Sequence, residues 1–240
     1  MKKIEKEPQP QHPNMLDRNR AILLARDLLN LKDWVILAIK VSRMIEQRPL
    51  PGDASELVSI AVIGPGEKVL MDMLIRPDGA VSSELLALHG CTQAQAFNAP
   101  VFAEVHKILS AGFRKTRVLS FNPTKTKDTL AELCKREKLE ALDGSFLDLQ
   151  LMYTRFVGEK ENPSDPGYKR QVLHPSKDSS QLHVTPLTEC KHVLALLNEM
   201  AGSSQSYDMA TAFNKGWSAA FYRPKPGPAD KIKEMLGLSD

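Results

Sequence analysis

In the first part of the chain, one segment has apolar residues at helical spacing, and three later segments have the apolar pattern of strands. Between residues 16 and 29 the apolar residues form one helical stripe, which predicts a helix with Asp17 as a candidate N-cap. Residues 34–39 form a short, continuous apolar run, which predicts a strand buried on both faces. Residues 57–63 and 68–75 predict two further strands, joined by a turn of glycine and proline. Because neighbouring strands with short links usually pair, these three segments predict an antiparallel meander.

After residue 75, the apolar residues are mostly spaced as in helices. The predicted helices span residues 82–88, 101–109, 127–138, 147–157 and 187–201. A fourth strand is predicted over residues 117–121, and a proline-containing loop over residues 159–181. A helix, three strands, two helices, a strand and further helices follow in this order, which indicates an α/β fold with a mixed sheet flanked by helices.

The two ends of the chain depart from this pattern. Residues 1–14 are charged and proline-rich, so they are predicted to be a disordered tail before a domain over residues 15–201. Residues 202–240 are predicted to be an accessory tail. Three aromatic residues between positions 213 and 221 are spaced four apart in it, which places them on one face of a helix. This face either packs on the domain or binds a partner protein.

Composition narrows the function classes only partly. Hydrophobic residues make up 42% of the chain and charged residues 25%, as in a globular protein with a real core. The net charge of +3 is too small to require a nucleic-acid partner. The longest apolar run is too short to span a membrane, so no membrane partner is predicted. The three cysteines are odd in number and far apart, which argues against disulfides and favours a reducing, cytoplasmic location.

Motif-like segments follow one another along the predicted domain. They are the buried run at 34–39, the two strands within 56–77, and residues 88–92, 99–102, 118–122, 148–153 and 187–197. In this order they resemble the DEDD 3′–5′ exonucleases, such as the proofreading subunit of bacterial replicases. The resemblance runs from about residue 34 to residue 201. It implies an RNase-H-like fold.

The resemblance also implies where catalytic acids would stand. In that family, four carboxylates hold two divalent metal ions that activate water and stabilise the leaving oxygen. The matching positions here are Ala38, Lys40, Thr126 and Glu189, whose formal charges cancel. His183 lies beside the position of the family's general base. One carboxylate next to an ammonium is not expected to gather two divalent cations, so we predict no metal cofactor.

Lys40 is open to two interpretations. Its ammonium can stand in for the positive charge of a metal ion and contact a phosphate directly. Alternatively, it pairs with Glu189 and stabilises an inactive site, which is the common fate of such a charge.

Five further residues are candidates for binding nucleic acid. The resemblance places His89 and Gly90 against the terminal nucleotide, although Gly90 also suits the turn after a helix. Asn122 can orient a phosphate or cap the helix that follows it. Lys125 and Lys127 belong to a basic stretch, and the resemblance places these two lysines beside the cleft.

Three functional hypotheses follow. The favoured one is a catalytically degenerate exonuclease-like protein that binds ends of single-stranded DNA or RNA without cleaving them. The second is an active exonuclease dependent on Mg²⁺ or Mn²⁺, which would need acids from elsewhere. The candidate replacements are Glu46, Asp53, Glu56 and Asp148. The third is a non-enzymatic module that binds a protein through the C-terminal tail.

Overall fold

The computed structural model describes residues 12–42, 56–78, 81–88, 90–162, 164, 166–173 and 185–205. All of these except Gln205 belong to one compact unit, Met1–Ser204. Within these ranges, no helix combines the length and the apolarity that crossing a bilayer requires. His89, His183 and the aromatic face at 213–221 lie outside the described residues, so the predictions for them stay predictions.

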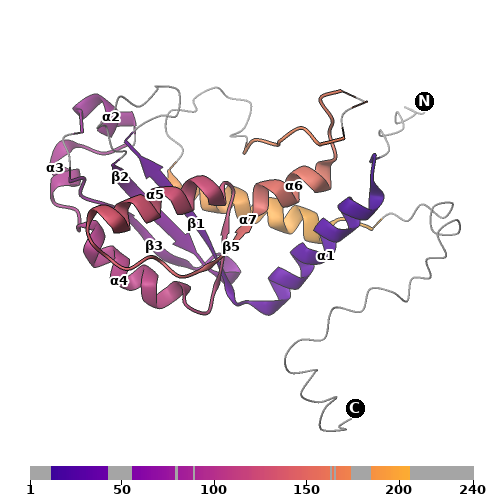
Figure 1. The fold of residues 1–240 in the computed structure, drawn as a ribbon, viewed down its shortest axis with the longest axis horizontal. Coiled ribbons are helices and arrows are strands. Elements are labelled where there is room, and N and C mark those ends of the chain that lie inside the picture. The colour runs from indigo at the N-terminus through magenta and orange to yellow at the C-terminus, as the bar shows by residue number, and fades with distance from the viewer. Residues whose placement is uncertain are drawn as a thin grey trace, which may run out of the picture. The chain divides into compact units, whose positions relative to one another are not determined.

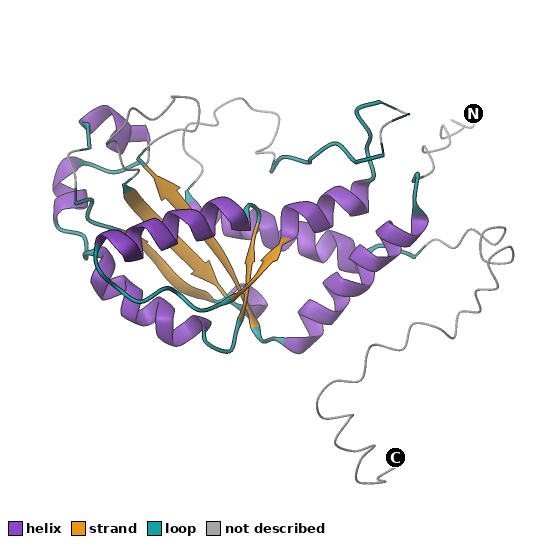
Figure 2. Ribbon diagram, in the orientation of Figure 1, coloured by secondary structure: helices purple, strands orange, loops and turns teal. Residues whose placement is uncertain are grey.

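Five strands form one mixed sheet in the order β3-β2-β1-β4-β5 (Figure 2). They are β1 (Trp34–Val41), β2 (Leu57–Ile63), β3 (Val69–Leu74), β4 (Arg117–Ser120) and β5 (Ser145–Asp148). β2 pairs antiparallel with both β1 and β3, whereas β4 pairs parallel with β1 and β5. The predicted meander and the predicted mixed α/β sheet are confirmed.

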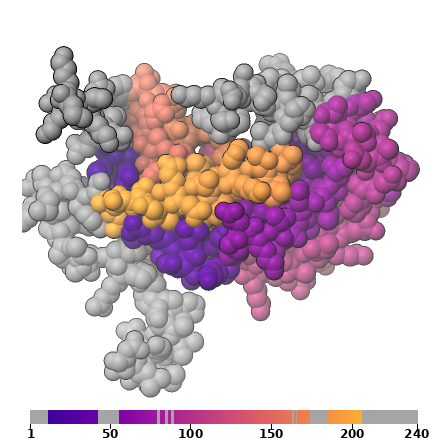
Figure 3. All heavy atoms as spheres, turned by 180° about the vertical axis from the view of Figure 1, so that it is seen from behind, coloured from indigo at the N-terminus to yellow at the C-terminus, as the bar shows by residue number. Residues whose placement is uncertain are grey.

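The helices pack on both faces of this sheet (Figure 1). They are α1 (Met15–Leu31), α2 (Ser83–Leu88), α3 (Gln93–Phe97), α4 (Phe102–Phe113), α5 (Pro123–Arg136), α6 (Leu149–Val157) and α7 (Pro186–Gly202). A short 3-10 turn, Pro65–Glu67, joins β2 to β3. One face carries α1, α6 and α7, and the other carries α4 and α5. Figure 3 shows α7 on the first of these faces, beside α1.

Strand β1 supplies side chains to both cores. Ile36 and Ala38 pack with α1, α6 and α7, whereas Val35 and Leu37 pack with α4 and α5. Because successive side chains of a strand point to opposite faces, a continuous apolar run is what such a position requires. The prediction of a strand buried on both faces is confirmed.

Two helix starts differ from the prediction, and capping explains both. Asn14, not Asp17, caps α1, because its Oδ1 accepts hydrogen bonds from the backbone N–H groups of Leu16 and Asp17. Asn122 caps α5, which begins at Pro123 instead of residue 127. A proline fits the first helical position because its missing N–H has no partner there anyway.

Two short elements were not predicted at all. Residues 145–148 form β5, and the helix predicted over residues 147–157 begins only at Leu149. This strand exists because it pairs in parallel with β4, a contact that local periodicity does not report. Helix α3 was also missed, since it has only five residues and is started by a capping box of Thr92 and Gln95.

We expect Leu197→Ala to destabilise the domain strongly. Leu197 lies on α7, which packs on β1 and β2, and it is 0% exposed. Its truncation leaves a cavity, so the free energy of unfolding should fall by about 2–5 kcal/mol in urea denaturation. As a matched control, Leu24→Ala removes a leucine of α1 that is 43% exposed, and the change should be below about 1 kcal/mol. Equal losses for both variants would contradict this assignment of the core.

Candidate nucleic-acid interface

The carboxyl end of β1 brings Lys40 together with the first turn of α7. Ala38 and Lys40 lie on the same sheet face because they are two residues apart on one strand. Thr185 caps α7, which places Glu189 in the helix's first turn. Lys40 Nζ donates a hydrogen bond of 2.9 Å to Glu189 Oε2, and the two side chains are 29% and 24% exposed. The ion pair named as one of the two interpretations of Lys40 is therefore present.

At the other two positions that the resemblance matches to catalytic acids, the side chains carry no charge. Ala38 is 2% exposed and packs in the core beneath α7. Thr126 is also buried, and its hydroxyl donates to the backbone oxygen of Asn122 at 3.0 Å. The same hydroxyl lies 3.1 Å from Ser120 Oγ at the end of β4. This donor set does not fit a pair of divalent metal ions, which need several carboxylate oxygens.

The charges of Lys40 and Glu189 also act on the side chain of Lys125. Burial lowers the pKa of Lys125, the nearby positive charge of Lys40 lowers it further, and the negative charge of Glu189 opposes both. Among the described residues, no hydrogen-bond or ion-pair partner contacts the Lys125 ammonium. We call Lys40, Lys125 and Glu189 the lysine cluster. With two ammonium groups and one carboxylate, the cluster carries an excess positive charge that suits an anion.

The remaining candidates are placed differently. Lys127 lies over the ring of Phe146, 5.6 Å from its centroid, about 200° around α5 from Lys125. The structure therefore does not bring Lys127 into the lysine cluster. Gly90 adopts a φ of +71° in the turn after α2, and its N–H donates to Ala87 O. Asn122 acts as a helix cap, since its side chain accepts from the N–H of Lys125.

The acids that a rearranged metal site would need are engaged elsewhere. Both oxygens of Glu56 accept hydrogen bonds from the Arg136 guanidinium, at 2.9 and 3.0 Å. Asp148 caps α6 by accepting from the N–H of Leu151 at 2.8 Å. Glu46 and Asp53 lie outside the described residues. Within the described ranges, no three histidine, cysteine or acidic side chains gather closely enough to hold a metal ion.

A polar hollow of about 410 Å³ adjoins the lysine cluster at Lys125. Its lining residues are Asn122, Thr124, Lys125, Asp128, Thr129, Glu132 and Arg170. The sequence does not predict Arg170 as a site residue, because it stands in a loop without periodicity or a motif. The one available signal was its charge, and isolated charges in loops are common.

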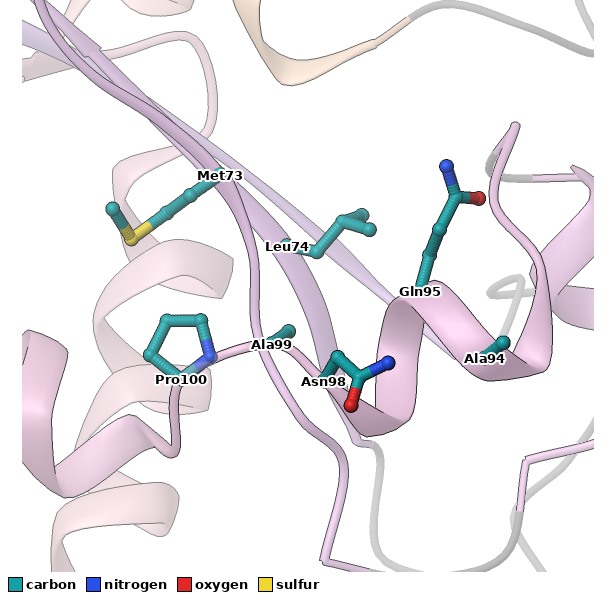
Figure 4. Close-up of a pocket in the computed structure, with 7 residues that line it drawn as sticks. All are labelled: Met73, Leu74, Ala94, Gln95, Asn98, Ala99 and Pro100. Carbon is teal, nitrogen blue, oxygen red and sulfur yellow. The ribbon is translucent and has the colours of Figure 1, made fainter.

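A second hollow, of about 430 Å³, lies by the edge strand β3 and shares no residue with the lysine cluster. Its walls are mostly apolar and come from β3, α3 and the loop that follows α3. Figure 4 shows the two amides on its rim, Gln95 and Asn98, with Leu74 and Pro100 among its apolar walls. It contains none of the candidate residues.

Comparison with known proteins identifies the fold. No family model matches the chain, and no curated protein sequence matches it either. Among solved structures, a full-length 3′-exonuclease matches with a TM-score of 0.51 and 15% identity, over 69% of this chain and 80% of that chain. The chain has the fold of a 3′-exonuclease. The predicted RNase-H-like α/β architecture is thereby confirmed.

Two other structures give lower scores. The nuclease domain of 3′hExo, a DEDDh family member bound to rAMP, has a TM-score of 0.49 and 13% identity, over 69% of this chain and 90% of that one. Exonuclease X in complex with 5′-overhanging duplex DNA has a TM-score of 0.38 and 15% identity, over 72% of this chain and 95% of that one.

If the four positions that the resemblance matches to catalytic acids converge in this fold, acids placed there should create a metal site. We expect the triple variant Ala38→Asp, Lys40→Glu and Thr126→Asp to melt at a lower temperature than the wild type without metal. The new carboxylates would repel one another and Glu189. Mn²⁺ should then raise the melting temperature of the variant by several degrees, because only the folded state binds it.

Differential scanning fluorimetry with Mn²⁺ or EDTA measures this effect. The wild type should show no shift, and Lys40→Glu alone should show little, because it supplies two acids only. A triple variant that folds but ignores Mn²⁺ would show that these positions do not converge.

Proposed function

We propose that this chain binds the ends of single-stranded DNA or RNA without cleaving them, on an exonuclease fold that lacks the metal-binding acids. The observation that carries the proposal is the 2.9 Å ion pair between Lys40 and Glu189. These two residues occupy two of the four positions at which the family resemblance expects acids. In the proposed function, this ion pair therefore stands where the resemblance implies a metal site.

The charges at these positions oppose catalysis. Two-metal cleavage of a phosphodiester needs carboxylates that hold both cations in place. Glu189 supplies the one carboxylate at the four positions, and Lys40 already neutralises it. An ammonium at this distance also repels any dication that approaches Glu189. The proposed activity accordingly needs neither Mg²⁺ nor Mn²⁺.

The same charges favour binding of an anion. Lys125 adds a half-buried ammonium without a partner among the described residues, so a phosphate that arrives there gains an unused donor. The start of α5 lies next to it, and helix N-termini carry partial positive charge. Phosphates of a single strand supply the matching negative charges. The solved structure with a similar fold is a 3′-exonuclease, which supports the end of a strand as the ligand.

The hypothesis of a protein-interaction module rests on residues 202–240, nearly all of which lie outside the described residues. It stays a prediction, as does a protein partner of that tail. A reducing, cytoplasmic location remains part of the proposal, and it is supported by Cys91, Cys134 and Cys190, which are all free and buried. Burial raises the pKa of the Cys190 thiol to about 12, which makes this thiol unreactive.

A cleavage assay tests the absence of catalysis. Single-stranded DNA and RNA labelled at the 5′ end are incubated with the protein in Mg²⁺, Mn²⁺ or EDTA. We expect intact oligonucleotide in all three conditions, because the residues that the structure describes contain no carboxylate set that could hold the metals. Glu189→Gln, purified in the same way, is the control for contaminating nuclease. A metal-dependent ladder from the 3′ end that only the wild type produces would overturn the proposal.

Charge reversal at Lys40 tests the binding. We expect Lys40→Glu to weaken binding of a single-stranded oligonucleotide about tenfold in a fluorescence anisotropy titration, because a phosphate contact becomes a repulsion. Lys107→Glu makes the same charge change at an exposed position of α4 and should have a clearly smaller effect. Melting curves verify that both variants fold. Equal affinities of Lys40→Glu and the wild type would remove Lys40 from the binding site.

A further inference from the structure

Arg170 is held in place by a buried glutamine. Gln150 lies on α6 and is 8% exposed, which is unusual for this residue type. Its Oε1 accepts a hydrogen bond of 2.5 Å from Arg170 Nε, and its Nε2 donates one of 2.6 Å to Gln171 O. A third bond, from the N–H of Gln171 to Thr154 Oγ1, ties the same loop to α6. The loop therefore presents Arg170 in a fixed position.

Arg170 lines the polar hollow beside α5. Its Nε donates to Gln150, whereas its two terminal NH₂ groups have no hydrogen-bond or ion-pair partner among the described residues. A guanidinium anchored at one edge keeps the donors that recognise phosphate oxygens. Lys125 lines the same hollow and also belongs to the lysine cluster. Lys125 thus connects the hollow to the lysine cluster.

The hollow also contains two acids. Asp128 and Glu132 follow Lys125 on α5 by about one and two turns. Their carboxylates repel phosphate, so a bound phosphate belongs with Lys125 and Arg170. Carboxylates accept hydrogen bonds and therefore suit the amino groups of a base. The lining as a whole fits one nucleotide unit, with its phosphate on the cations and its base toward the acids.

We propose that this hollow is a second subsite, which binds the phosphate of a nucleotide upstream of the strand end held at the lysine cluster. Arg170 is its phosphate-binding residue, and Gln150 is a positioning residue that acts through Arg170. The inference rests on the proposed function, since it extends the strand from the lysine cluster over α5. It goes further because it predicts a dependence on ligand length.

The test compares a mononucleotide with a single strand of roughly ten nucleotides. Arg170→Gln should weaken binding of the strand about three- to tenfold and leave the affinity for the mononucleotide unchanged. The slope of log affinity against log salt should become shallower by about 0.7, the value for one lost phosphate contact on a single strand. Gln150→Leu should reduce the affinity for the strand in the same direction, because Arg170 loses its anchor.

Lys169→Gln is the matched control. It removes one positive charge from the neighbouring residue, whose ammonium pairs with Glu159 at 2.7 Å and does not line the hollow. If Arg170→Gln behaves like Lys169→Gln in both affinity and salt slope while the strand still binds, the subsite is refuted and the proposed function stands. If the wild type binds no single strand at all, the proposed function fails and the subsite fails with it.

Discussion

The central strand β1 must bury side chains on both of its faces, and the rest of the described unit depends on this constraint. Val35 and Leu37 pack against α4 and α5, while Ile36 and Ala38 pack against α1, α6 and α7. A strand with two apolar faces is stable only between two layers of helices. The strand leaves the core at its carboxyl end, where α5 and α7 begin. Polar chemistry is concentrated at this end because the core excludes it elsewhere.

A half-buried ammonium at that end needs a partner, and Glu189 provides it. Removing a charge from water costs free energy, which an opposite charge at hydrogen-bond distance offsets. Two-metal sites use the same attraction, but with mobile dications and several acids. In this chain the positive charge is attached covalently to the strand. The proposed function follows from this difference, because a fixed ammonium can hold a phosphate but cannot activate water as a metal ion does.

The helical period of α5 turns residues that are close in sequence toward different surroundings. Its cap, Asn122, sets where the helix begins, and this start turns Thr126 into the core toward Ser120. Lys125 faces the lysine cluster, whereas Lys127 faces Phe146. The two lysines look equivalent in the sequence, since both belong to the same basic stretch. Their different surroundings follow only from the position of the helix start, which periodicity predicts at residue 127 instead of Pro123.

The sequence by itself determined features that depend on neighbouring residues: the strands of the meander, the mixed α/β class, and the residue types at the positions that the resemblance matches to catalytic acids. Each can be read from periodicity or residue identity within a short window. Only the tertiary structure showed that Lys40 pairs with Glu189, because the two residues stand 149 positions apart in the sequence. The same holds for β5, which depends on pairing with β4, and for Arg170, which depends on an anchor on α6. Long-range contacts bring together residues that are far apart in the sequence, and no local pattern indicates that they will meet. The candidate site consists mostly of such contacts.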